Sequence, residues 1–226
     1  PPRSTLFPST TLFRSVGEAV EYWTGMVATA TRVLGPEHPN TLATRNNHAY
    51  WRGEAGDPTG AATVFKGLLT EMLRVLGPDH PDTLTTRGNL ARCQGEAGNA
   101  VGAATAYEAL LTDRLRVLGP DHPRALDTRH NLAGLQGEAG DPAGAAAAYK
   151  DLLGDRLQVQ GPDHPHTLDT RHNLVWWRGQ AGDPAGATAA YEALLADHLR
   201  VRGPDHPHAL TTRNNRAYWR DRAAEF

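Results

Sequence analysis

Apolar residues recur with helical spacing in two stretches of the middle of the chain, at about 123–139 and about 142–159. In the second stretch they fall at i, i+4, i+7 and i+8, the spacing of an amphipathic helix with one apolar face. The pattern predicts two helices, which we call helix A and helix B. Their apolar positions are Leu126, Leu132, Leu135 and Ala139 in helix A, and Ala145, Ala146, Tyr149, Leu152, Leu153 and Leu157 in helix B.

Glycine, aspartate and proline mark the break between the two helices. Gly-Asp-Pro stands at 140–142, recurs at 56–58 and 182–184, and becomes Gly-Asn-Ala at 98–100. Glycine takes the positive φ after a helix, aspartate caps the next N-terminus, and proline suits the first helical turn. So short a connection indicates that helix A and helix B pack antiparallel.

A second string, Gly-Pro-Asp/Glu-His-Pro, joins one helix pair to the next. It begins at five glycines spaced 42 residues apart: Gly35, Gly77, Gly119, Gly161 and Gly203. Its glycine and first proline stop helix B, and its last proline suits the start of helix A. Because one helix pair cannot bury its apolar face alone, such pairs must stack. The predicted fold class is all-α: an α-solenoid of antiparallel helix hairpins.

The repeat divides the chain into a leader and an array. Residues 16–226 are predicted to hold a helix B at about 16–34, four complete 42-residue repeats and a helix A at about 207–224. Residues 1–15 match nothing later in the chain. We interpret them as a non-native segment that resembles a translated sequencing adapter, with a disordered tail as the alternative. The chain is expected to be a fragment.

The helices resemble the tetratricopeptide repeat (TPR). Asn-Leu-Ala stands in helix A at 89–91 and 131–133, and the 42-residue period and its linker are similar to the kinesin-light-chain-like subclass, common in bacterial signalling proteins. Helix B carries Ala-x3-aromatic at Ala19/Trp23, Ala61/Phe65, Ala103/Tyr107, Ala145/Tyr149 and Ala187/Tyr191. The resemblance implies that the α-solenoid is a right-handed superhelix. It also implies a non-enzymatic scaffold that binds a peptide segment or a partner domain in a concave groove. The alternative is a sensor or autoinhibitory arm of a larger signalling ATPase or transcriptional regulator.

The resemblance also implies which residues line the groove. An asparagine recurs in every helix A, although asparagine is a poor residue for a helix interior. Its amide is expected to bond a ligand backbone, and a hydrogen bond between helices is the equal alternative. The series is Asn47, Asn89, Asn131, Asn173 and Asn215. Variable residues on the same face are expected to tune binding, with a merely solvated face as the alternative: Asp127, Asp169, His130, His172, Tyr50, Arg92, Trp176 and Tyr218.

Helix A departs from the TPR pattern in two ways. Aromatic bulk moves one position earlier, to Trp51, Trp177 and Trp219, which favours a rotated packing of helix A. Arginine replaces the early tryptophan, and the series is predicted to form ion pairs or stacks between repeats, with phosphate binding as the alternative. Its members are Arg45, Arg87, Arg129, Arg171 and Arg213.

Composition narrows the classes of function and source. A net charge of −2 argues against nucleic-acid binding, which needs a basic stripe. No apolar run reaches the roughly 18 residues of a membrane span. A single cysteine, Cys93, excludes a disulfide scaffold and fits a cytoplasmic location. Only Lys66 and Lys150 are lysines among 23 basic residues, which points to a high-GC bacterial source.

No catalytic constellation is apparent. The sequence has no G-x-x-x-x-G-K-[ST] phosphate loop and no G-x-S-x-G elbow. The Asp-His-Pro-His strings at 163–166 and 205–208 each offer two histidines and one aspartate, whereas Zn²⁺ needs three or four ligands in a defined geometry. In the other repeats Asn40, Asp82 or Arg124 replaces the second histidine. We interpret them as hinge residues, so no cofactor or metal is expected, and a metal-dependent hydrolase is the least favoured alternative. Cys93 occupies the repeat position of Trp51 and Trp177, which predicts a packed core thiol.

Overall fold

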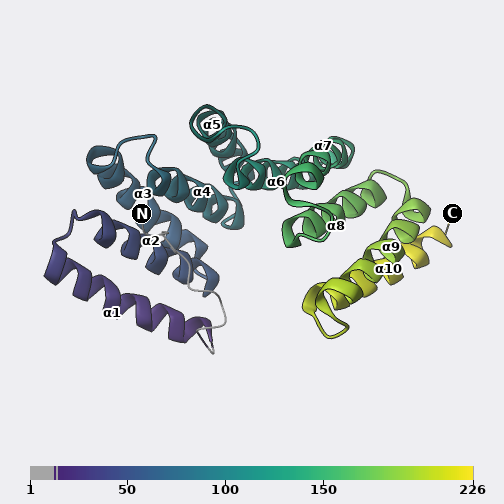
Figure 1. Cartoon of the computed structure of the whole chain (residues 1–226), viewed down its shortest axis with the longest axis horizontal. Helices are drawn as coiled ribbons and strands as arrows, with labels where there is room; N and C mark the ends of the chain where they lie inside the picture. Colours follow the sequence, from purple (N-terminus) through teal and green to yellow (C-terminus); the bar gives the residue numbers. More distant parts are fainter. Residues whose placement is uncertain (1–12, 14, 226) are drawn as a thin grey trace. The chain divides into compact units, whose positions relative to one another are not determined.

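The computed structural model describes Phe13 and residues 15–225, and these residues form ten α-helices and no strand (Figure 1). The predicted all-α fold is confirmed. The predicted leader lies outside the described residues except for Phe13 and Ser15, and Ser15 caps the first helix. The helices are α1 (Val16–Leu34), α2 (Pro39–Glu54), α3 (Pro58–Val75), α4 (Pro81–Glu96), α5 (Ala100–Leu118), α6 (Pro123–Glu138), α7 (Pro142–Gln160), α8 (Pro165–Gln180), α9 (Pro184–Arg202) and α10 (Pro207–Ala223).

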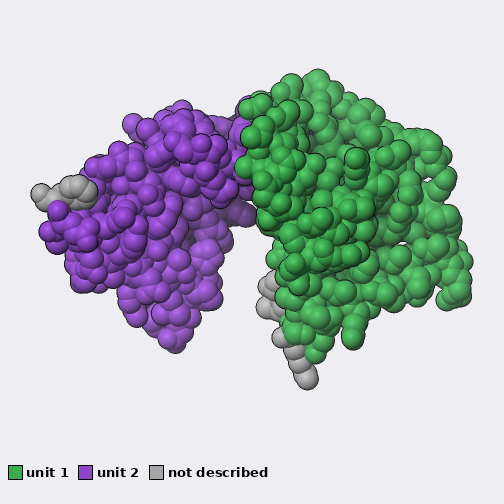
Figure 2. All heavy atoms as spheres, turned by 180° about the vertical axis from the view of Figure 1, so that it is seen from behind, with its two compact units in different colours: residues 1–117 green, residues 118–226 purple. Residues whose placement is uncertain are grey.

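The chain divides into two compact units, residues 1–117 (unit 1) and residues 118–226 (unit 2) (Figure 2). Within unit 1, α1 packs against α2, α2 against α3, and α3 against α4. Within unit 2, the same holds from α6 through α10. The even-numbered helices are the predicted helices A and the odd-numbered ones are the helices B. Each unit is thus a stack of antiparallel hairpins, as a solenoid requires.

The two linker strings, Gly-Asp-Pro and Gly-Pro-Asp/Glu-His-Pro, end and begin helices as predicted. All positive-φ residues in the described part of the chain are their glycines, such as Gly77 with φ 87° and Gly140 with φ 98°. Asp141 caps α7 by accepting a hydrogen bond of 2.8 Å from the Gly144 backbone N–H. Proline stands in the first turn of all five helices A.

The pentapeptide histidine has a role that sequence reasoning missed. It is the N-cap residue of helix A, and its Nδ1 accepts a hydrogen bond from the backbone N–H two residues later. The distance is 3.1 Å at His80 and 3.2 Å at His164, for example. An accepting Nδ1 carries no proton, so the imidazole is neutral when it caps. In three of the five strings the acidic residue pairs with an arginine of helix B, as in Asp163–Arg200 at 2.6 Å.

Helix B aromatics and small helix A residues build the cores. In unit 1, Phe65 packs with Ala49, Ala61 and Cys93, all fully buried. This confirms Cys93 as a core thiol, and burial raises its pKa. In unit 2, the largest cluster is built from both helices B and A: Leu168, Val175, Ala187, Tyr191, Leu194 and Trp219.

The displaced tryptophans of helix A sit against glycines of the preceding helix A. A Cβ added at Gly179 would lie 2.7 Å from atoms of the Trp219 ring. A Cβ added at Gly137 would lie 2.6 Å from the Trp177 ring. The tryptophan ring therefore occupies the space that a side chain at the glycine would fill. This packing explains why helix A carries its aromatic residue one position earlier than the TPR pattern.

The arginine series forms ion pairs, but within a repeat and not between repeats as predicted. Each of these arginines forms an ion pair with an acidic residue 26 positions later on the following helix B. The pair forms within one repeat because the two helices of a hairpin are antiparallel neighbours. The pairs are Arg45–Glu71 at 2.5 Å, and Arg87–Asp113, Arg129–Asp155 and Arg171–Asp197 at 2.6 Å. Among the described residues Arg213 has no such pair.

Candidate functional site

Two of the predicted groove asparagines bond a histidine of the preceding helix A. The Nδ2 of Asn173 on α8 lies 3.0 Å from His130 Nε2 and 3.4 Å from the Tyr149 hydroxyl. The Nδ2 of Asn215 on α10 makes the same contacts with His172 Nε2 at 2.9 Å and the Tyr191 hydroxyl at 3.4 Å. Each asparagine therefore joins a helix A to the hairpin before it.

The tyrosine closes each of these networks. Tyr149 donates its hydroxyl to the His130 carbonyl at 2.9 Å, and Tyr191 donates to the His172 carbonyl at 3.1 Å. Since the asparagine nitrogen can only donate, the histidine Nε2 accepts and the imidazole is neutral. Burial lowers the pKa of both His130 and His172 to about 4, which agrees with neutral rings. We refer to the two sets as the His-Tyr-Asn networks.

Unit 1 has a related contact with other residues. Asn89 donates to Asn46 Oδ1 at 3.3 Å, and Asn46 stands at the repeat position of His130 and His172. Asn47 is buried, and its Oδ1 has no partner among the described residues. Asn131 is exposed on α6. The inter-helix alternative is thus observed at Asn89, Asn173 and Asn215, whereas a grip on a ligand backbone stays a prediction for the series.

Replacing Asn173 is expected to destabilise the fold. Asn173→Ala removes both hydrogen bonds and leaves His130 Nε2 unpaired, which should cost about 1–3 kcal/mol of unfolding free energy. Asn214→Ala is the matched control, because Asn214 is an exposed asparagine inside α10. Urea unfolding of both variants checks this. Equal effects would show that the network contributes nothing.

The predicted groove aspartates are engaged by arginines of helix B. Asp127 pairs at 2.9 Å with Arg156, whose side chain is 1% exposed, and Asp169 pairs at 3.3 Å with Arg202. Asp169 also lies 3.2 Å from His208 Nδ1. Sequence reasoning missed these arginines, because nothing in the helix B pattern distinguishes an inward-pointing arginine from a solvated one.

Aromatic candidates from neighbouring helices A contact each other. In unit 2 the Trp176 and Tyr218 rings are stacked 5.6 Å apart with an interplanar angle of 27°. Tyr218 is 40% exposed and Trp176 is half-buried. In unit 1 the same position brings the Arg92 guanidinium over the Tyr50 ring, 5.0 Å from its centroid. The same repeat position therefore joins two neighbouring helices A in each unit.

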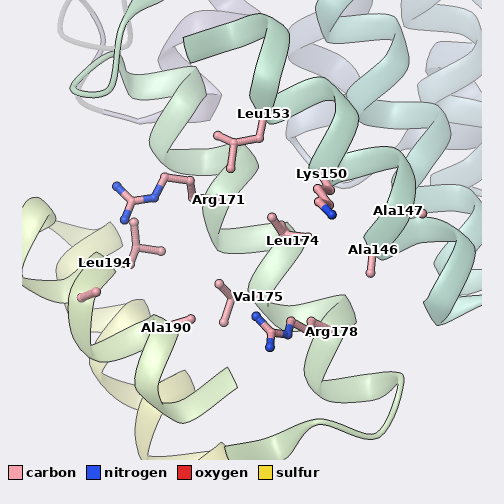
Figure 3. A pocket seen from close by; sticks show the side chains of 11 residues that line it. Ala146, Ala147, Lys150, Leu153, Arg171, Leu174, Val175, Arg178, Ala190 and Leu194 are labelled. Carbon is pink, nitrogen blue, oxygen red and sulfur yellow. The ribbon is translucent and has the colours of Figure 1, made fainter. Parts of the chain in front are cut away.

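An apolar pocket that the sequence did not predict lies in unit 2 between α7, α8 and α9 (Figure 3). Its volume is about 640 Å³. Leu153, Leu174, Val175 and Leu194 supply apolar walls, and Lys150 lies at its edge. Arg171 and Arg178 also line it, but each is paired, with Asp197 at 2.6 Å and Asp183 at 2.7 Å.

The pocket and the predicted groove residues use opposite faces of α8. Asp169, His172, Asn173 and Trp176 recur with helical spacing on one face, which we call the helix A face. Leu174 and Val175 stand on the other side and line the pocket. The two surfaces can therefore be changed independently by substitution.

Metal and membrane chemistry gain no support from the described part of the chain. No three or more His, Cys, Asp or Glu side chains gather there in a group that could hold a metal ion. The first histidine of each Asp-His-Pro-His string caps a helix: His164 caps α8 and His206 caps α10. None of the helices within the described ranges combines the length and apolar character needed to cross a bilayer.

Comparison with known proteins identifies the repeat. The family model described as tetratricopeptide repeat matches residues 83–124 and 167–208. Each match spans one full 42-residue period, from a helix A through the following helix B into the next helix A. No curated protein matches the chain.

Solved structures show the same fold. Nearly identical TPR-like repeats of a candidate kinesin light chain from Podosopora anserina give a TM-score of 0.65 at 24% identity, over 83% of this chain and 89% of that one. A single-substitution variant of those repeats gives 0.66 at 24% identity, over 82% and 87%. BtubC (BKLC) from P. vanneervenii gives 0.75 at 19% identity, over 95% and 86%. Two stretches of the chain thus match the tetratricopeptide repeat, and the chain shares its fold with kinesin-light-chain-like repeat proteins.

Proposed function

We propose that this chain binds an extended peptide segment of a protein partner along the helix A face of unit 2. The observation that carries the proposal is the Trp176–Tyr218 stack, a large aromatic surface with Tyr218 40% exposed. Aromatic side chains held rigidly and partly exposed are the residues that dominate binding energy at protein interfaces. The stack holds both rings in place before a ligand arrives, which reduces the entropic cost of binding.

The neighbouring amide limits what the ligand presents. Both N–H groups of Asn173 are directed to His130 and Tyr149, so its Oδ1 is the atom left for a ligand. An amide oxygen accepts, and therefore favours a ligand that offers backbone N–H groups, as an extended peptide does. Asp169 is already paired with Arg202, so charge contributes less than apolar contact.

The pocket of Figure 3 is the second candidate surface. Its volume of about 640 Å³ lies within the range of ligand sites, and its apolar walls suit a bulky aliphatic or aromatic side chain of a partner. Lys150 at its edge would favour an acidic neighbour of that side chain. Because this surface is on the far side of α8, substitutions separate it from the helix A face.

Tyr218→Ala is expected to weaken peptide binding by about 2 kcal/mol, as loss of an interfacial aromatic does. Peptides selected from a random library on the wild-type chain would be titrated against this variant by calorimetry. Leu115→Ala is the matched control, since Leu115 on α5 is 39% exposed but lies off the helix A face. Titration of the same peptides against Lys150→Glu tests whether they bind at the pocket instead.

The two variants distinguish the helix A face from the pocket. Weaker binding by Tyr218→Ala alone supports the helix A face. Loss in Lys150→Glu alone would move the site to the pocket and overturn the proposal. Unchanged affinity in both variants would exclude both surfaces. Thermal unfolding of each variant checks that the fold is intact, because Tyr218 also contacts the Trp219 ring at 4.9 Å.

A further inference from the structure

The pocket of Figure 3 has the dimensions of a site for a small ligand. Its floor is α8, which packs against both α7 and α9. Its volume of about 640 Å³ lies within the range of roughly 300–1,000 Å³ that small-molecule sites occupy. Alanines on the two flanking helices leave this space open, because their side chains are short: Ala146 and Ala147 on α7, and Ala190 and Ala193 on α9.

The charged residues at the pocket are all basic, and none of the described residues that line it is acidic. Arg171 is paired with Asp197, and Arg178 is paired with Asp183. Lys150 is exposed and has no ion-pair partner among the described residues. Its ammonium group is therefore the uncompensated charge at the rim of an apolar pocket, which complements a ligand with one negative charge.

We propose that the pocket binds a small amphipathic anion, namely an aliphatic chain that ends in a carboxylate, such as a medium-chain fatty acid. The carboxylate, which is ionised near pH 7, would lie at the ammonium group of Lys150. A volume of about 640 Å³ exceeds that of any single side chain, which favours a free molecule over a side chain of a protein partner. The aliphatic chain would pack on the apolar walls: Leu153, Leu174, Val175 and Leu194.

Unit 1 does not reproduce this combination of residues. Thr63 stands at the repeat position of Ala147, and Gln94 stands at that of Arg178. The first change adds a hydroxyl group to the wall, and the second removes a basic side chain from the rim. Lys66 on α3 keeps the lysine at the same repeat position but lacks these neighbours. We therefore expect one site per chain, in unit 2, and Lys66 offers a matched control.

Apolar contact is expected to supply most of the affinity, and the lysine is expected to supply the preference for negative charge. Each buried CH₂ group tightens binding up to about fourfold, so decanoate should bind more tightly than octanoate. An exposed charge pair contributes up to about fivefold. Decylamine, which has the same chain length and a positive charge, should therefore bind about fivefold or more weakly than decanoate.

Calorimetric titration of the full chain with sodium decanoate, below the concentration at which it forms micelles, tests the proposal. Lys150→Glu should weaken binding about fivefold or more, whereas Lys66→Glu, which makes the same charge change on α3, should not. Ala193→Leu should weaken binding about tenfold, because the larger side chain overpacks the occupied pocket. Ala28→Leu is its control, since Ala28 is also exposed but lies on α1.

Thermal unfolding of each variant checks that the fold is intact. The inference would be overturned if the wild-type chain showed no saturable binding of decanoate, if decanoate and decylamine bound equally, or if the two lysine variants lost affinity equally. Loss of decanoate binding in Tyr218→Ala would move the ligand to the helix A face, and displacement of a selected peptide by decanoate would show that the pocket holds the peptide. Either result would also exclude a separate site. Decanoate binding by a chain that selects no peptide would support this site while excluding the proposed function.

Discussion

Acidification from about pH 7 to about pH 5 is expected to destabilise unit 2 far more than unit 1. Three histidines of unit 2 cause this: the half-buried His130 and His172 and the fully buried His198. The pKa of each is lowered from 6.5 to about 4, first of all by burial. Their counterparts in unit 1 include Asn46 and Met72, which do not titrate.

The sign follows from where the proton binds. In the unfolded chain these histidines take up protons below pH 6.5, while in the folded chain they stay neutral down to about pH 4. The unfolded state therefore binds more protons, and stability falls as the pH falls through this window. The slope is about 1.4 kcal/mol per pH unit for each fully responding histidine. The stability that depends on neutral histidines is therefore fully present above about pH 6.5 and is lost as the pH falls toward 4.

The charged groups around each ring act in both directions. Arg156 lowers the pKa of His130 while Asp127 and Asp169 raise it. His208 lowers the pKa of His172 and Asp169 raises it. Burial outweighs these contributions at both sites. His198 has no hydrogen-bond partner on either ring nitrogen and is fully buried, so a charge there would be especially costly.

Hydrogen exchange, corrected for the intrinsic effect of pH, measures the two units separately. Protection of α6 to α10 should fall on acidification before that of α1 to α4. The control is a triple variant, His130→Asn, His172→Asn and His198→Met, which places the corresponding residue types of unit 1 in unit 2. That variant should lose most of the difference between the units. An equal response of both units in the wild type would contradict the account.

Gly179→Ala is expected to destabilise the protein, although alanine favours helices over glycine by about 1 kcal/mol. The new Cβ would lie 2.7 Å from the ring of Trp219, which is 1% exposed and cannot retreat. Overpacking of this kind costs about 1–3 kcal/mol, and the loss of ring packing adds to it. The net effect in urea unfolding should be a loss.

Gly154→Ala is the matched control. Gly154 lies inside α7, and a Cβ added there meets nothing within 4 Å. This variant should gain about 0.5–1 kcal/mol from helix propensity alone. In a Trp219→Leu background the cost of Gly179→Ala should shrink, because the rigid ring is gone. If both glycine variants stabilise the protein equally, the glycine–tryptophan packing is not what positions α10.

Local chemistry explains why the fold was predictable. Helix limits depend on capping residues and proline, and the predicted break at 140–142 is where α7 begins with Pro142. The histidine caps were missed because serine, threonine, aspartate and asparagine are the usual caps, and an imidazole Nδ1 replaces them only in the right rotamer. The pattern of residue types does not reveal that rotamer.

The site was harder to predict because its contacts cross between repeats. Asn173 and His130 are 43 residues apart, and only the stacking of α8 on the preceding hairpin brings them to 3.0 Å. The arginine series shows the same limit, since ion pairing followed from composition but the partner required the geometry of the hairpin. The pocket in unit 2 is a product of packing between three helices and has no local signature.

Photocrosslinking tests the proposed peptide-binding face most directly. The crosslinker benzoylphenylalanine would replace Tyr218 on the helix A face in one variant and Lys150 at the pocket edge in another. A peptide selected on the wild-type chain should crosslink from position 218 and not from position 150. Crosslinking from position 150 alone, or from neither position while binding persists, would contradict binding along the helix A face of unit 2.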